Sequence, residues 1–120
     1  MPEREWDLEV TREFELWWDS LSESEQVSVG AAIDLLERRG PSLGFPFSSA
    51  VVISRHRGMR ELRIQHAGRP FRVLYAFDSR RIGILLIGGD KTGQDRWYER
   101  VVPHADQLLD DHLDEISSEY

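Results

Sequence analysis

Four short runs of strand-forming residues follow one another in the middle of the chain, and only a few polar residues separate each run from the next. Connections this short favour antiparallel neighbours, because a parallel pair needs a crossover of about a dozen residues or more. We therefore predict an antiparallel meander, with the last run in a central position because it is apolar on both faces. The four runs are Ala50–Ser54, Met59–His66, Phe71–Phe77 and Ile82–Ile87.

The chain before the meander changes from a strand period to a helical period. Apolar and charged residues alternate over positions 6–10, which predicts a half-buried strand. From near Thr11 the apolar residues recur at helical spacing, and Ser22 with Glu25 forms the capping-box pattern that opens a second helix. Gly40 and the proline after it end that helix. We therefore expect two short helices arranged as an antiparallel hairpin.

Two further segments complete the predicted domain. Residues 41–50 form a turn-rich connection that contains Phe45 and Phe47, which we expect to be buried. Glycines then break the last strand, and a C-terminal helix begins near Trp97, with Pro103 expected to kink it or to begin its second half. Neither a repeat nor a linker interrupts the pattern, so residues 1–120 predict a single α+β domain.

Composition excludes several classes of protein. The 120 residues include no cysteine, which removes thiol catalysis and thiolate metal sites and suits a reducing cytoplasm. The four histidines share no metal-ligand spacing, so we expect neither a metal nor a cofactor. Apolar stretches such as Ile84–Ile87 are far short of the ~20 residues of a membrane-spanning helix. We expect a soluble cytoplasmic protein.

The net charge of −7 hides an uneven distribution along the chain. Residues 1–53 hold four arginines against eleven acidic residues, whereas residues 54–100 hold eleven basic residues against five acidic ones. Residues 101–120 hold six acidic residues and no arginine or lysine. The basic middle third can bind phosphate locally, although an acidic chain is a poor general binder of nucleic acid. A solvated basic face between two acidic regions is the alternative.

The turn between the second and third runs predicts a pair of opposed arginines. A two-residue turn at Ala67-Gly68 would place Arg63 directly opposite Arg72. Like charges opposite each other destabilise a strand pair. Either an anion held between the two guanidinium groups or neutralisation by Glu61, on the same face as Arg63, would account for the pairing.

A second turn at Ser79-Arg80 would pair Tyr75 with Ile84 and place both on the face that packs against the helices. The last strand would then end near the opposed arginines. Lys91 follows this strand, and Tyr98 begins the next helix. Two guanidinium groups, an ammonium group and a phenol suit the binding of a phosphodiester and its developing negative charge.

Several of these segments resemble the RelE/HigB-like toxins of bacterial type II toxin–antitoxin modules, most of all the phage-derived HigB branch. The likeness is carried by Arg60–Arg63, by Arg72–Phe77, and by Ile84–Ile87 followed by Lys91. With the preceding strand, helix hairpin and loop in the same order, it covers about residues 5–115. It implies a RelE-like α+β fold with an N-terminal strand and helix hairpin, an antiparallel meander sheet and a C-terminal helix.

The resemblance also implies an activity. Typical members enter the ribosomal A site and cleave mRNA without a metal or cofactor, so the expected function is a ribosome-dependent mRNA interferase that arrests translation and growth. ParE-like inhibition of DNA gyrase and a non-catalytic interaction domain with the same fold are the alternatives. The implied catalytic residues are Arg72, Arg63, Lys91 and Tyr98, and the expected RNA-binding residues are Arg55, Arg57, Arg60 and Arg69.

The implied partners are a cognate antitoxin, expected to be a helix-turn-helix HigA-like protein, together with the ribosome and mRNA. DNA would be reached only through the antitoxin, and no membrane is involved. The basic residues between positions 55 and 72 are the expected target of an acidic antitoxin segment, because complementary charge speeds association and limits wrong pairing.

Overall fold

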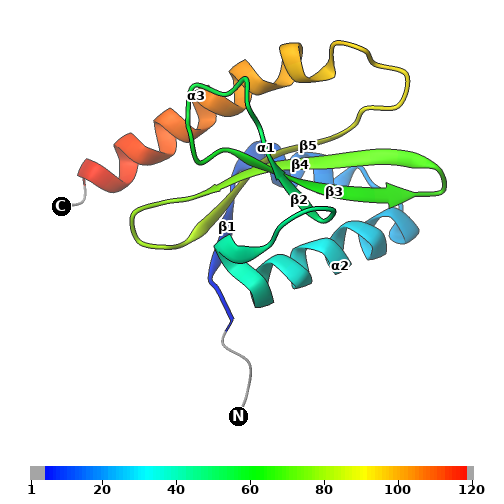
Figure 1. Cartoon of the computed structure of the whole chain (residues 1–120), viewed down its shortest axis with the longest axis horizontal. Coiled ribbons are helices and arrows are strands. Elements are labelled where there is room, and N and C mark those ends of the chain that lie inside the picture. The colour runs from blue at the N-terminus through cyan, green and yellow to red at the C-terminus, as the bar shows by residue number, and fades with distance from the viewer. Residues whose placement is uncertain (1–4, 119–120) are drawn as a thin grey trace.

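A five-stranded sheet separates α2 on one side from α3 on the other (Figure 1). The computed structural model describes residues 5–118. The elements, in chain order, are β1 (Leu8–Val10), α1 (Arg12–Asp19), α2 (Glu23–Arg39), a short 3-10 turn (Gly40–Ser42), β2 (Ser48–Ala50), β3 (Arg60–His66), β4 (Arg69–Phe77), β5 (Gly83–Asp90) and α3 (Trp97–Ser118). The expected strand, helix hairpin, meander and C-terminal helix are all present, which confirms the α+β prediction.

The strand order is β1-β5-β4-β3-β2. Strands β2 to β5 form the predicted antiparallel meander, and β1 adds to β5 in parallel. The last strand is interior, as predicted, although β4 occupies the middle of the sheet. The first run of the meander was misplaced: β2 is Ser48–Ala50, and residues 51–58 form a loop in which Val52 and Ile53 are exposed.

The helix hairpin forms from the local signals in the sequence. Thr11 caps α1 by accepting a hydrogen bond from the backbone N–H of Phe14, and its hydroxyl donates to the carbonyl of Leu86 at 2.6 Å. The expected capping box of Ser22 and Glu25 opens α2. These caps satisfy N–H groups that the first turn of a helix leaves unpaired.

The β3–β4 register agrees with the prediction, and the β4–β5 register does not. Arg63 pairs with Arg72. On the next strand pair, however, Tyr75 lies opposite Leu85 rather than Ile84, and a bulge follows. The reason is a longer turn, in which the buried Asp78 accepts backbone hydrogen bonds at its carboxylate. The consequence is that Leu85 faces the helix hairpin, whereas Ile84 faces α3.

Strand β5 continues through Gly88 and Gly89, where the sequence predicted a break. The ring of Trp17 lies where a side chain on Gly88 would stand, and the Trp97 ring leaves only 2.9 Å for one on Gly89. The two glycines therefore let one aromatic ring from each helical layer pack directly against the strand backbone.

Both faces of the sheet are covered by apolar packing. Helices α1 and α2 pack against one face, where their apolar side chains form a core with those of β3 and β4. Leu36 is fully buried in this core. Helix α3 covers the other face, and Pro103 lies inside this helix. The burial expected for Phe45 and Phe47 is wrong: their exposed fractions are 76% and 52%, and both residues lie just before β2, the edge strand of the sheet.

Candidate functional site

Glu61 on β3 and Arg72 on β4 form a buried ion pair on the face of the sheet that α3 covers. Both residues are only 5% exposed, and Nε of Arg72 lies 2.9 Å from Oε1 of Glu61. Nε of Arg72 has no well-directed hydrogen bond among the described residues, so its contact with Glu61 is an ion pair. Nη1 of Arg72 donates to the carbonyl of Phe71 at 2.9 Å. A buried charge requires such partners, and Glu61 supplies the opposite one.

Tyr98, near the start of α3, contacts the same carboxylate. Its hydroxyl donates to Oε1 of Glu61 at 2.6 Å. Burial of the phenol and this hydrogen bond to Glu61 raise the pKa of Tyr98, so its hydroxyl keeps its proton at neutral pH. Oε1 of Glu61 is thus shared by Arg72 and Tyr98, which join the sheet to α3.

Arg63 lies opposite Arg72 but closer to solvent. Its Nη1 is 4.0 Å from Oε1 of Glu61, its side chain is 32% exposed, and its guanidinium carbon lies 5.4 Å from the centre of the Phe45 ring. The two arginines therefore share one carboxylate at different depths. Neutralisation by Glu61, one of the two explanations open from the sequence, is present in the structure.

Lys91 completes the cluster from the segment that follows β5. Its backbone N–H donates to the carbonyl of Pro70 at 3.0 Å, and Nζ lies 5.6 Å from the centre of the Tyr98 ring. The fold thus brings Arg63, Arg72, Lys91 and Tyr98 together around Glu61. We define these five residues as the Glu61 cluster.

Arg55 and Arg57 lie outside this cluster, in the loop between β2 and β3. Arg55 forms a bidentate ion pair with Asp110 of α3, and its Nε is 4.0 Å from Asp106. This pairing raises the pKa of Arg55 and ties the loop to α3. Arg57 is exposed, and it forms no ion pair with any residue between 5 and 118.

Arg60 and Arg69 also have partners. Nε of Arg60 donates to the Ser48 hydroxyl at 3.0 Å. Arg69 lies at the far end of the β3–β4 hairpin, where it pairs with Glu25 at 2.6 Å and with Asp90 at 3.2 Å. Three of the four outer arginines are therefore engaged within the protein, and they do not form one continuous free basic surface.

Sequence reasoning missed two features of the site. The sequence indicates Glu61 only as a neighbour of Arg63, yet its contacts with Arg72 and Tyr98 organise the cluster. The diagonal spacing of Glu61 and Arg72 across β3–β4 was a usable signal, since diagonal pairs on one face are within reach of long side chains. No sequence signal distinguished the exposed Phe45 beneath Arg63 from a buried aromatic residue.

Two negative findings apply to residues 5–118. No group of three or more histidine, aspartate or glutamate side chains in this range is placed to hold a metal ion. No helix in the same range is both long and apolar enough to cross a membrane.

Comparison with known proteins identifies the family. Residues 16–110 match the family model described as "Phage derived protein Gp49-like (DUF891)". The chain is 46% identical over 100 residues to the "Putative toxin HigB3" of Mycobacterium tuberculosis, covering 82% of this chain and 86% of that one. It is 39% identical over 110 residues to the "Putative toxin HigB2" of the same organism, covering 90% of this chain but only 54% of the relative.

A solved structure shares the fold. The crystal structure of an archaeal RelE–RelB complex from Pyrococcus horikoshii OT3 aligns with a TM-score of 0.54 at 14% identity, over 74% of this chain and 97% of that one. This likeness confirms the expected RelE-like fold. The family match over residues 16–110 and the 46% identity to the putative toxin HigB3 show that the chain belongs to the Gp49-like family of phage-derived proteins, the HigB-like branch that its sequence resembles.

Proposed function

We propose that this protein is the toxin of a type II toxin–antitoxin module and that it acts in the cytoplasm as a ribosome-dependent mRNA interferase. The family and its relatives named as toxins support the first part. The observation that carries the second part is the Glu61 cluster, which gathers two guanidinium groups, an ammonium group and a protonated phenol at one end of the sheet.

The proposed reaction uses the RNA's own 2′-hydroxyl as the nucleophile. This oxygen bonds to the adjacent phosphorus as the bond to the 5′-oxygen breaks, which leaves a 2′,3′-cyclic phosphate and a 5′-hydroxyl end. The hydroxyl proton is lost and the departing oxygen gains one. The protein then needs to supply alignment, charge stabilisation and proton transfers, and positioning alone can contribute several kcal/mol.

Exposure and partners divide the roles among the cluster residues. Arg63 and Lys91 are the more accessible cations, so they are the groups proposed to contact the phosphate first. Arg72 is buried beneath Arg63, and we assign it to bind the scissile phosphate from the floor of the site. Its ion pair with Glu61 holds its orientation. Tyr98 keeps its proton, and we assign its hydroxyl to donate to the phosphate once bound RNA replaces Glu61 as the acceptor.

The exposed ring of Phe45 supports an RNA contact beside this cluster. Arg63 lies over one face of the ring, and Phe45 is 76% exposed. Aromatic rings paired with arginine stack on nucleobases without regard to sequence. Arg57, exposed on the adjoining loop, can add a phosphate contact, as proposed also for Arg55, Arg60 and Arg69.

The proposed partners are the ribosome, its mRNA and a cognate antitoxin of the helix-turn-helix HigA-like kind. The relative of known structure was crystallised as a RelE–RelB complex, which supports an antitoxin partner.

Primer extension on translated mRNA after induction tests this function. Breaks linked to codons are the expected result. DNA breaks with intact mRNA would contradict mRNA cleavage and favour inhibition of DNA gyrase. Continued growth without either kind of break would indicate a non-catalytic interaction domain. Arg63→Ala is the informative variant, because its partly exposed side chain can be removed without opening the core. Arg96→Ala, with a side chain that is 86% exposed, is the matched control.

A further inference from the structure

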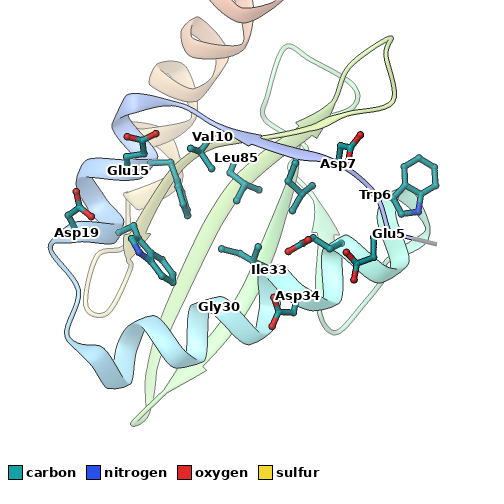
Figure 2. Close-up of a pocket in the computed structure, with 14 residues that line it drawn as sticks. Glu5, Trp6, Asp7, Val10, Glu15, Asp19, Gly30, Ile33, Asp34 and Leu85 are labelled. Atoms are coloured by element: carbon teal, nitrogen blue, oxygen red, sulfur yellow. The ribbon is translucent and has the colours of Figure 1, made fainter. Parts of the chain in front are cut away.

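A groove lies on the opposite side of the sheet from the Glu61 cluster, between β1, α1 and α2 (Figure 2). Its volume is about 720 Å³. The side chains of Ile33 and Leu85 point into its middle (Figure 2). Apolar side chains form its floor: Leu8, Phe14, Trp18, Ile33 and Leu85.

Carboxylates form the rim of this groove. Glu15 and Asp19 lie at one end, and Glu5, Asp7 and Asp34 lie toward the other (Figure 2). A sixth acidic residue, Glu37, also lines it, whereas no arginine, lysine or histidine of the described chain does. None of these six carboxylates forms an ion pair within residues 5–118. Arg38 lines an adjoining hollow with Glu5, Asp34 and Glu37, and it forms no ion pair with them among the described residues. The lining of the groove itself therefore carries negative charge only.

Burial and the neighbouring carboxylates both act on Glu37. Burial, and then the neighbouring carboxylates of Glu5 and Asp34, raise the pKa of Glu37. A cation placed at the rim would relieve this repulsion. Nucleic acid and anionic lipid would add to it, so neither suits this surface.

We propose that this groove binds a basic amphipathic segment of the antitoxin, with apolar side chains on the floor and lysine or arginine side chains against the acidic rim. The proposal rests on the proposed toxin function for the identity of the partner. An exposed apolar groove with a charged rim is the usual form of a docking site for an amphipathic segment. Complementary charge would speed association and fix the orientation of the segment.

This surface differs in sign from the one expected from the sequence. Most arginines between positions 55 and 72 are paired within the protein, whereas the groove carboxylates are not. The groove also leaves the Glu61 cluster uncovered, because the two lie on opposite faces of the sheet. Groove binding by itself therefore does not block the site.

The test is a titration of the full-length protein with a synthetic helical peptide that carries leucine on one face and lysine on the other. Calorimetry measures the Kd, and the methyl NMR signals of Ile33 and Leu85 report where the peptide binds. The double variant Glu15→Lys, Asp34→Lys reverses two exposed rim charges and should weaken binding at least tenfold. The matched control Asp95→Lys, Asp114→Lys makes the same change in net charge at exposed positions away from the groove and should leave the Kd unchanged.

The remaining outcomes are equally decisive. The counterpart peptide with glutamate in place of lysine should not shift the Ile33 and Leu85 signals. Equal Kd values for both double variants, or shifts confined to other residues, would overturn the groove proposal. Failure of the mRNA cleavage assay with peptide binding intact would overturn the interferase activity and leave the groove in place. Cleavage of mRNA without peptide binding in the groove would overturn the groove proposal and leave the interferase activity in place.

Discussion

Arg63 and Arg72 stand directly opposite each other on neighbouring strands, yet Arg72 is buried against Glu61 while Arg63 reaches toward solvent over Phe45. One carboxylate thus stabilises two cations at different depths. The deep pair holds the strands and α3 together through Tyr98, and the shallow cation remains available for a ligand. This arrangement explains how like charges can face each other across a strand pair.

Arg72→Lys should lower mRNA cleavage by about 100-fold, because lysine provides a point charge where the guanidinium provides a fixed fork of donors. Circular dichroism should show a folded protein. Arg96→Lys, at a highly exposed position, should cleave as the wild type does. A folded Arg72→Lys protein that arrests growth as fully as the wild type would refute the phosphate-binding role and leave Arg72 as a structural ion-pair residue.

Tyr98→Phe should lower the free energy of unfolding by about 1–3 kcal/mol, because it removes the hydroxyl that donates to buried Glu61 and keeps the ring. Its effect on cleavage should be milder than that of Arg72→Lys. Urea unfolding measures the first effect. In a Glu61→Gln background the same substitution should cost less, since the two groups form one hydrogen bond. Strictly additive costs would show that the contact contributes nothing.

Trp17→Ala should cost about 3–5 kcal/mol of stability, because the ring packs between α1 and the backbone of β5. The reciprocal test is Gly88→Ala, whose new methyl group would collide with that ring and should cost about 1–3 kcal/mol. Gly58→Ala, where a methyl group meets nothing within 4 Å, is the control. Unfolding midpoints that barely move for Gly88→Ala would contradict the close contact.

Glu25 should make stability depend on acid pH. A hydrogen bond from the Ser22 backbone and then the ion pair with Arg69 lower the pKa of Glu25 from 4.5 to about 2. Because the folded pKa lies below the ordinary one, the contribution is full above about pH 4.5 and is lost as pH falls toward 2. Stability curves should therefore converge for wild type and Glu25→Gln over this window. Glu23→Gln, in the same helical turn, is the control, and a constant gap between wild type and Glu25→Gln would contradict the assignment.

The sequence by itself determined those features that depend on neighbours along the chain. The capping box of Ser22 and Glu25 satisfies helix N–H groups within one turn, and the two-residue turn at Ala67-Gly68 sets the opposition of Arg63 and Arg72. The meander and its order follow from short connections in the same way. Such features were predictable because each depends on only a few consecutive residues.

Only the tertiary structure decided the features that depend on residues far apart in sequence. Because the turn at Asp78 is longer and a bulge follows it, Leu85 rather than Ile84 faces the helix hairpin. This register depends on packing against both helical layers. The shared carboxylate of Glu61 required β3, β4 and α3 to meet. The acidic groove exists because three separate segments lie side by side, and their combined charge is a property of the folded surface alone.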